Sequence, residues 1–285
     1  MTTGPDARVV LPLRRSGTEP PLFCVHPGSG FGLPYLELLP YVGDDVPVVA
    51  FQARGLLAPA EPPASLDELA TDYLAQVRAV QPAGPYRLLG WCIGGRAAFE
   101  IACRLREAGE AVELLALVSI LPPVAELPLT DEQILRDMLR PPGTAVIDAE
   151  LDALCRLPLD YPALSAYLRR TGHPMRRLSE ATMGAVMRNY QISDRLNRTP
   201  VTRTFDGDAL VFAPRQGGQP EFTSESWRPH LTGEIDFRRI DARHGEMLDP
   251  EPARTIGAVI DDKLHGAAVR PKHTEGAEDV TADHG

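Results

Sequence analysis

Lysine is scarce in this chain, because only Lys263 and Lys272 occur among its 29 lysine and arginine residues. Both lie near the C-terminus, so we do not expect a lysine to act as the catalytic base. Acidic residues number 39, which leaves a formal charge of −10. That balance argues against nucleic acid as a partner and gives no reason to expect an anionic membrane surface as one.

Cysteine is also sparse, and long apolar runs are missing. Cys24, Cys92, Cys103 and Cys155 show neither the CxxC spacing of zinc sites nor the density of a disulfide framework, so we expect free thiols and no bound metal. No stretch approaches the roughly 20 apolar residues of a membrane span, and no basic segment followed by an apolar run opens the chain. These absences predict a cytoplasmic protein.

What is present suffices for one large domain, since 285 residues with 44% hydrophobic content can bury a full core. Apolar segments of strand length alternate with segments of helical period, which predicts an α/β fold with a mostly parallel, doubly wound sheet. Strands are expected near 9–13, 22–25, 47–53, 86–91, 112–119, 209–213 and 234–240, and helices near 36–41, 65–80, 93–108 and 252–264.

The alternation breaks in the middle of the chain. From about 124 to 199 the segments are helical, are separated by prolines and contain no convincing strand. We interpret this stretch as an insertion that packs over the site as a lid, with a plain helical subdomain as the alternative. The main domain is expected to cover 1–265, and the polar segment 266–285 is expected to be a disordered tail.

One short stretch predicts chemistry. A buried strand ends in Gly90-Trp91-Cys92-Ile93-Gly94 and runs into a helix, which is the pattern of a nucleophile elbow with sulfur in place of oxygen. The pentapeptide alone is weak, because a free cysteine is more often a small buried hydrophobe. The strand before it and the helix after it supply the context that the elbow requires, so Cys92 is the predicted nucleophile.

Two loops complete the predicted site. The segment 26–32 (HPGSGFG) follows a strand directly, and such a glycine-rich loop can supply half of an oxyanion hole, although an ordinary strand-to-helix turn is the alternative. His244 follows the last predicted strand, from which a base can reach a nucleophile at the same edge of the sheet. The order of nucleophile then histidine matches that of the α/β-hydrolases.

Four segments carry a family resemblance: LFCVHPGSGFG at 22–32, LLGWCIGGRAAFEIACRLREAG at 88–109, SILPP at 119–123 and RHGEMLDPEPA at 243–253. In these, the chain resembles the thioesterase domains of nonribosomal peptide and polyketide synthases, which have the α/β-hydrolase fold. The resemblance implies an acyl group that arrives as a thioester on the phosphopantetheine of a carrier protein and moves to Cys92. It also implies His244 as the base, the backbone N–H groups of Ser29 and Ile93 as oxyanion donors, and no cofactor of the chain's own.

Two departures from the family pattern stand out. The family usually has serine at the elbow, and it usually has an aspartate where this chain has Ser119. The other place for an orienting acid, after the strand at 209–213, holds Pro214, Arg215 and Gln216. Glu126, Asp131, Glu221 and Glu225 remain open as substitutes. Because a thiol ionises more readily than a hydroxyl, a Cys92–His244 dyad would be chemically sufficient.

The sulfur changes the expected reaction. An acyl-Cys is still an activated thioester, which an amine or a second carrier thiol attacks more readily than water does, so transfer or ring closure is favoured over hydrolysis. The chain begins at Met1 without a carrier domain, which suggests a free-standing enzyme of natural-product biosynthesis. The alternatives are an editing thioesterase that clears misprimed carriers, a hydrolase of small soluble esters or thioesters, and a non-catalytic binding protein of the hydrolase fold.

Overall fold

The computed structural model describes residues 6, 8–58, 60–120, 130–139, 149–216 and 223–266. In this part of the chain, seven strands form one sheet in the order β1-β3-β2-β4-β5-β6-β7. They are β1 (Val10–Arg14), β2 (Leu22–Val25), β3 (Val48–Phe51), β4 (Tyr86–Trp91), β5 (Val112–Val118), β6 (Ala209–Pro214) and β7 (Ile235–Ile240). Only the edge strand β1 pairs antiparallel, with β3, and the other neighbours pair in parallel. The predicted mostly parallel sheet is therefore confirmed.

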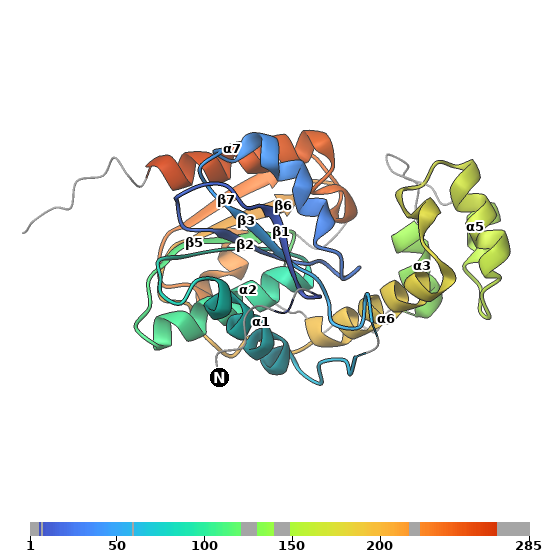
Figure 1. Ribbon diagram of the computed structural model, residues 1–285, viewed down its shortest axis with the longest axis horizontal. Coiled ribbons are helices and arrows are strands. Elements are labelled where there is room, and N and C mark those ends of the chain that lie inside the picture. The colour runs from blue at the N-terminus through green and yellow to red at the C-terminus, as the bar shows by residue number, and fades with distance from the viewer. Residues whose placement is uncertain are drawn as a thin grey trace, which may run out of the picture.

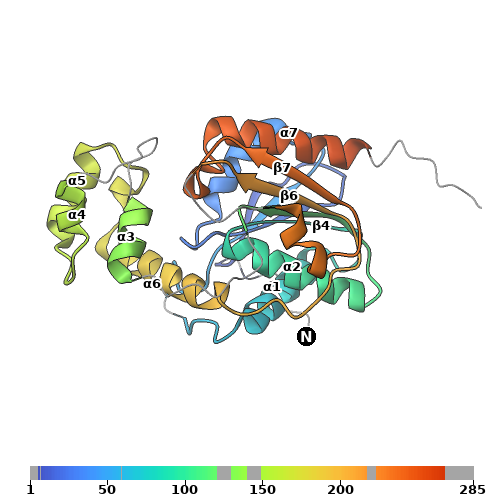
Figure 2. The ribbon, with the colours of Figure 1, turned by 180° about the vertical axis from the view of Figure 1, so that it is seen from behind.

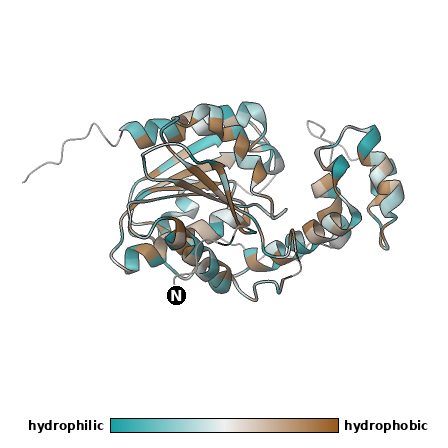
Figure 3. Cartoon of the chain, viewed as in Figure 1, coloured by the Kyte–Doolittle hydropathy of each residue, from teal (hydrophilic) through white to brown (hydrophobic). Residues whose placement is uncertain are grey.

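Helices cover both faces of the sheet, as the doubly wound prediction required. Figures 1 and 2 show α7 (Pro250–Gly266) on one face, and α1 (Leu66–Val80) and α2 (Ile93–Glu107) on the other. The short 3-10 segment η1 (Leu33–Tyr41) lies beside α7, where Gly257 allows close contact with Tyr41. Because both faces are covered, β2, β3 and β6 are buried along their whole length. Figure 3 shows apolar residues concentrated on these strands.

Local sequence signals set the start of α1. The Ser65 hydroxyl accepts a hydrogen bond from the Glu68 backbone N–H at 3.0 Å, and the Glu68 carboxylate accepts one from the Ala64 N–H at 2.7 Å. The first bond satisfies a backbone donor that the first helical turn leaves unpaired, and the second ties the glutamate side chain to the residue before the cap. The start predicted from the serine and the glutamate three residues later is thus confirmed.

The described residues between 130 and 199 are helical, as predicted. They form α3 (Asp131–Leu139), α4 (Ala149–Leu154), α5 (Tyr161–Arg170), the short η2 (Pro174–Arg177) and α6 (Glu180–Asn197). These helices share a small apolar core of their own, which includes Leu135, Leu151, Leu164, Tyr167 and Val186. Figure 1 shows α3 and α5 standing beside the sheet and α6 leading back to it. A role as a lid stays a prediction.

Two sequence-based predictions fall largely outside the described residues. The segment 121–129, which contains most of SILPP and Glu126, is not described, and neither is 267–285. Gly266, which we assigned to the tail, is the last residue of α7. Among the described helices, none combines the length and the apolar character needed to cross a membrane.

Candidate active site

Cys92 occupies a sharp turn between β4 and α2. Its backbone has φ 58° and ψ −128°, a conformation that residues other than glycine rarely adopt. The Cys92 N–H donates to the Val118 carbonyl at 3.0 Å, and the Cys92 carbonyl accepts from the Gly95 N–H at 2.9 Å. These bonds hold the turn between its own strand, the next strand and the helix, which is the geometry that the elbow pattern predicts.

The two glycines of the elbow are required by contact with backbone. A Cβ atom on Gly90 would overlap the Gly94 carbonyl oxygen, and one on Gly94 would overlap the Val25 carbonyl oxygen. Both positions lie far inside van der Waals contact, so any side chain would push the strand and the helix apart. The second contact also brings the first turn of α2 against the end of β2.

Cys92 differs from the other three cysteines in its surroundings. Cys24, Cys103 and Cys155 are buried, whereas Cys92 is partly exposed. Burial raises the pKa of the Cys103 thiol to about 12 and that of Cys155 to about 11, and it raises the pKa of Cys24 further still. Those three thiols remain protonated at neutral pH and behave as small apolar side chains.

The pKa of the Cys92 thiol is lowered instead. Burial acts to raise it, but four interactions together outweigh that effect: the charge of His244, a hydrogen bond with the His244 ring, the Ile93 backbone N–H and the Asn197 side-chain amide. All four favour the negatively charged sulfur over the neutral thiol. Cys92 is therefore the one cysteine whose environment promotes the thiolate.

His244 is held from two sides. Its Nδ1 lies 2.7 Å from the Ser119 hydroxyl oxygen, and its backbone carbonyl accepts a hydrogen bond of 3.1 Å from the indole N–H of Trp91. Ser119 directly follows β5, has φ 49° and is only 2% exposed. Since Nδ1 faces Ser119, the other ring nitrogen, Nε2, is available for the thiol of Cys92.

Ser119 contacts the His244 ring at the place where the sequence pattern indicated a missing aspartate. A hydroxyl can orient an imidazole through a hydrogen bond without carrying a charge. The Cys92–His244 dyad itself stays a prediction. Of the other residues considered, Glu225 lies in the short turn η3 (Ser224–Ser226). Glu126, Glu221 and the side chain of Asp131 lie outside the described residues.

The glycine-rich loop lies next to the elbow. β2 and β4 are parallel neighbours, with Val25 opposite Gly90, so the loop after β2 and the turn after β4 leave the same edge of the sheet. Ser29 is 7% exposed, and the loop is closed by a 2.9 Å hydrogen bond from the Gly30 N–H to the Pro27 carbonyl. The predicted oxyanion donors, the N–H groups of Ser29 and Ile93, thus come from adjacent segments, and their role stays a prediction.

Sequence reasoning missed one neighbour of Cys92. Asn197, the last residue of α6, donates a side-chain hydrogen bond to the Cys92 sulfur at 3.9 Å. Arg96, in the first turn of α2, donates to the backbone carbonyls of Asn197, at 2.9 Å, and of Thr199. No local pattern could have indicated this contact, because it joins residues that lie 105 positions apart.

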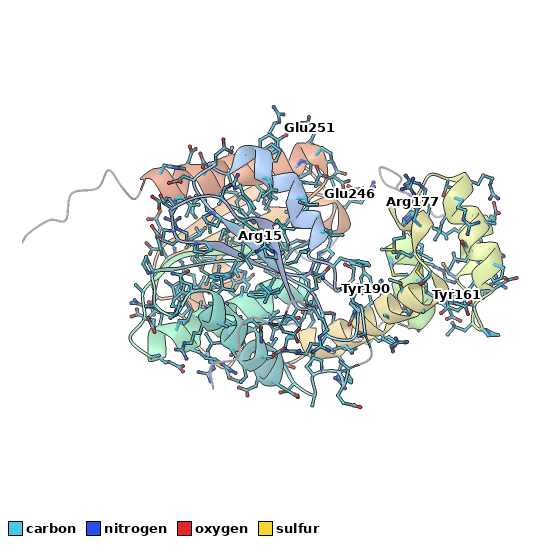
Figure 4. All side chains as sticks on the ribbon, in the orientation of Figure 1. Arg15, Tyr161, Arg177, Tyr190, Glu246 and Glu251 are labelled. Carbon is cyan, nitrogen blue, oxygen red and sulfur yellow. The ribbon has the colours of Figure 1, made fainter. Side chains whose placement is uncertain are left out.

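A cavity of about 250 Å³ opens beside Ile93. Its walls come from the loops after β2 and β3, from α1 and from α6, and comprise His26, Ala53, Arg54, Glu61, Pro63, Glu68, Leu69, Asp72, Tyr73, Ile93, Asn189, Ile192, Ser193 and Leu196. The side-chain nitrogen of Asn189 is buried here without a hydrogen-bond partner. Next to it on α6, Tyr190 lies against Gly28, between the helical insertion and the sheet (Figure 4).

His26 is the other histidine near the site, and both of its ring nitrogens are taken up by hydrogen bonds within the protein. Its Nδ1 lies 2.7 Å from the Pro27 carbonyl, which can only accept, so Nε2 accepts the hydrogen bond of 2.6 Å from the Tyr73 hydroxyl. Burial lowers the pKa of His26 to about 4, so it is neutral at physiological pH. Within the described residues, no three His, Cys, Asp or Glu side chains gather closely enough to hold a metal ion.

Comparison with known protein families gives a match over most of the chain. The family model described as "Thioesterase domain" matches residues 20–262. The dimodular nonribosomal peptide synthase of Bacillus subtilis (strain 168) is 38% identical over 264 residues, which cover 90% of this chain and 11% of the relative. Enterobactin synthase component F of Escherichia coli (strain K12) is 32% identical over 252 residues, or 88% of this chain and 18% of the relative. The chain thus spans only a small part of these relatives.

Solved structures show the same fold. Holo-AB3403, a four-domain nonribosomal peptide synthetase bound to AMP and glycine, has a TM-score of 0.75 at 22% identity, over 90% of this chain and 20% of that one. The NocB thioesterase domain, in covalent complex with a fluorophosphonate nocardicin G analog, has a TM-score of 0.65 at 22% identity. The match covers 90% of this chain and 99% of that one. The arrangement of sheet and helices matches theirs.

Proposed function

The chain belongs to the thioesterase domain family, and from this we propose that it moves acyl groups from carrier-protein thioesters to Cys92, and from Cys92 to a second nucleophile, in the biosynthesis of nonribosomal peptides or polyketides. The observation that carries the proposal is the partly exposed thiol of Cys92 at the elbow, with a lowered pKa and His244 beside it. Thioester exchange is the reaction that such a thiol performs best, because the thiolate is the nucleophile.

In the first step, Nε2 of His244 takes the proton of the thiol, and the sulfur of Cys92 attacks the thioester carbonyl. The developing oxyanion is held by backbone N–H groups, for which Ile93 and Ser29 are our candidates. The carbonyl then re-forms, the bond to the pantetheine sulfur breaks, and that sulfur takes the proton from His244. The second step runs in reverse with an incoming thiol or amine. Ser119 keeps the proton on Nδ1, so that Nε2 can act as the base.

Ser119 also contacts His244, so it is the rival nucleophile within the same site. Three features favour Cys92 over Ser119. The Cys92 backbone has the geometry of an elbow at the start of α2, its side chain is partly exposed whereas Ser119 is 2% exposed, and Ser119 lies at Nδ1, the nitrogen that orienting groups usually hold. Mapping the acyl adduct to one residue or the other decides between them.

Sulfur at the elbow favours transfer over editing. Passage of an acyl group from pantetheine to cysteine exchanges one thioester for another at nearly constant free energy, so the loaded enzyme remains able to donate. An editing hydrolase gains nothing from this reversibility, because its product is the free acid. We therefore favour transfer to a second carrier or to an amine as the function, with hydrolysis of misprimed carriers as the second candidate.

The direct test loads the protein from an acylated carrier protein. We expect a mass increase equal to the acyl group, located on the peptide that contains Cys92, and its passage to a second holo-carrier or an added amine. Cys92→Ala should give no adduct, whereas Cys103→Ala, which removes a buried thiol from the helix that follows the elbow, should load normally. Free acid as the sole product, or an adduct on Ser119, would contradict the proposal.

We place the acyl group in the cavity beside Ile93, the residue that follows Cys92; neither Cys92 nor His244 lines this cavity, and its size favours a short acyl group. Its volume of about 250 Å³ lies below the range of roughly 300–1,000 Å³ that is usual for sites of drug-sized ligands. Among the charged residues of its wall, Glu61, Glu68 and Asp72 outnumber Arg54, which already pairs with Asp72 at 2.6 Å. A neutral or cationic acyl group therefore fits the cavity better than an acyl group that ends in a carboxylate.

The unpartnered amide of Asn189 predicts a preference for oxygenated acyl chains. We expect the protein to load an oxo- or hydroxyacyl thioester about 5–10-fold faster than the unsubstituted chain of the same length, because one added hydrogen bond contributes about 1 kcal/mol. Asn189→Leu should remove this preference, and Ile192→Val, a change in the apolar wall, should retain it. Loading rates measured by intact mass check both, and equal preferences in the wild type and Asn189→Leu would refute the assignment.

A further inference from the structure

The carboxyl end of α6 reaches the sulfur of Cys92. We propose that Asn197 is a catalytic residue that stabilises the Cys92 thiolate, and that Arg96 positions it. This inference rests on the proposed role of Cys92 as nucleophile. Its basis is the hydrogen bond of 3.9 Å from Nδ2 of Asn197 to the sulfur, which comes from the helical insertion and not from the elbow itself.

Arg96 fixes the backbone that carries this amide. Arg96 is only 2% exposed, and its guanidinium donates to the carbonyls of Asn197 and Thr199, just where α6 ends. The last carbonyls of a helix have no partners within the helix and carry partial negative charge, so a cation is favourable there. Burial lowers the pKa of Arg96 to about 10, which leaves it charged at neutral pH. A buried charge of this kind is unfavourable unless its hydrogen bonds are made, and here they are made to the segment that holds Asn197.

The chemistry of the contact favours one state of the sulfur. An amide N–H bonds more strongly to a thiolate than to a thiol or to the neutral sulfur of an acyl-Cys. Asn197 therefore stabilises the form of Cys92 that attacks, and the interaction weakens once the sulfur is acylated. Because the donor belongs to α6, the reactivity of Cys92 depends on where the helical insertion lies.

We expect the pH profile of Cys92 alkylation in the wild type to cross that of a variant that lacks the Asn197 amide. Lowering a thiol pKa increases the thiolate fraction tenfold per unit at pH values below the pKa, but it also weakens the nucleophile by about threefold per unit. Removing the Asn197 amide should raise the pKa of Cys92, so alkylation slows by about threefold per unit of pKa at low pH and speeds up by about threefold per unit at high pH. A merely structural disturbance would change the rate by the same factor at every pH.

The experiment measures alkylation of Cys92 by iodoacetamide across pH, with the modified peptide identified by mass, in the full chain. Asn197→Ala should shift the profile to higher pH, and Asn197→Asp, which places a carboxylate beside the sulfur, should shift it further. Arg96→Met should shift the profile in the same direction, and Arg96→Lys should give a profile between those of the wild type and Arg96→Met. Thr199→Ala, which keeps the carbonyl that Arg96 binds, should leave the profile unchanged.

Two outcomes would overturn the inference: an Asn197→Ala profile that coincides with the wild type, or one that is lower by a constant factor throughout. If Arg96→Met fails to fold, the two Asn197 variants still carry the test. The acyl-loading assay separates this inference from the proposed function. Loading on Cys92 with unshifted profiles would refute the role of Asn197 alone, whereas shifted profiles without any loading would refute the proposed reaction and leave the thiolate contact standing.

Discussion

Replacing Cys92 by serine is expected to lower the rate of enzyme acylation by roughly 10²–10⁴-fold, the range that general-base assistance usually contributes. A serine hydroxyl is far less acidic than a thiol, so it depends on a base that becomes strongly basic as it takes the proton. In α/β-hydrolases of the serine type a carboxylate supports the imidazolium that forms. Here Ser119 lies on Nδ1 at 2.7 Å, and its hydroxyl brings no charge. We therefore expect this environment to suit a sulfur nucleophile better than an oxygen one.

The same substitution should change the products. Any acyl-Ser that forms is an oxoester, which no longer returns its acyl group to a carrier thiol, so the remaining turnover should release free acid. Acyl-enzyme appearance by intact mass and product partition by chromatography check the two parts separately, with Cys92→Ala as the inactive reference. Acylation of Cys92→Ser at the wild-type rate would show that the thiol is dispensable, and would contradict the assignment of this site to a cysteine nucleophile.

Much of this arrangement could be predicted from local sequence. The spacing of Gly90, Cys92 and Gly94 indicated the elbow because steric contact there admits no side chain, and a constraint of that kind is visible in a pentapeptide. The buried strands were predictable because a sheet that is covered on both faces requires continuous apolar runs. The position of His244 followed from parallel topology, which brings the loops after the strands to one edge.

The polar contacts around Cys92 and His244 could not be predicted in this way. The bond between Ser119 and His244 joins residues 125 positions apart, and that between Asn197 and Cys92 joins residues 105 apart. A hydroxyl or an amide has no periodic signature, and its partner depends on ångström-scale packing of elements that are distant in sequence. The sequence pattern showed only that the usual aspartate is absent at Ser119. In the structure, the Ser119 hydroxyl contacts Nδ1 of His244 at that position, and it does so without a charge.

That difference leads to the second large effect, the rescue of the serine variant by a carboxylate. Adding Ser119→Asp to Cys92→Ser should raise acylation by about 10–10²-fold over the single variant, because the carboxylate stabilises the imidazolium that a hydroxyl nucleophile requires. The backbone admits the change, since aspartate tolerates the φ of 49° found at Ser119 better than most residues do. At 2% exposure the new charge is favourable only when His244 is protonated, which ties its benefit to proton transfer.

The matched control for the rescue is Ser119→Asn, which has the shape of aspartate without its charge and should restore nothing in the Cys92→Ser background. With Cys92 intact, Ser119→Asp should change the acylation rate by only a fewfold, because the thiol has less need of a strong base. Acylation rates for the wild type, for each single variant and for the double variant measure the coupling directly. Equal effects of the aspartate on both nucleophiles would mean that Ser119 only holds the ring in place. A large effect confined to the hydroxyl would mean that this chain dispenses with the acid because its nucleophile is sulfur.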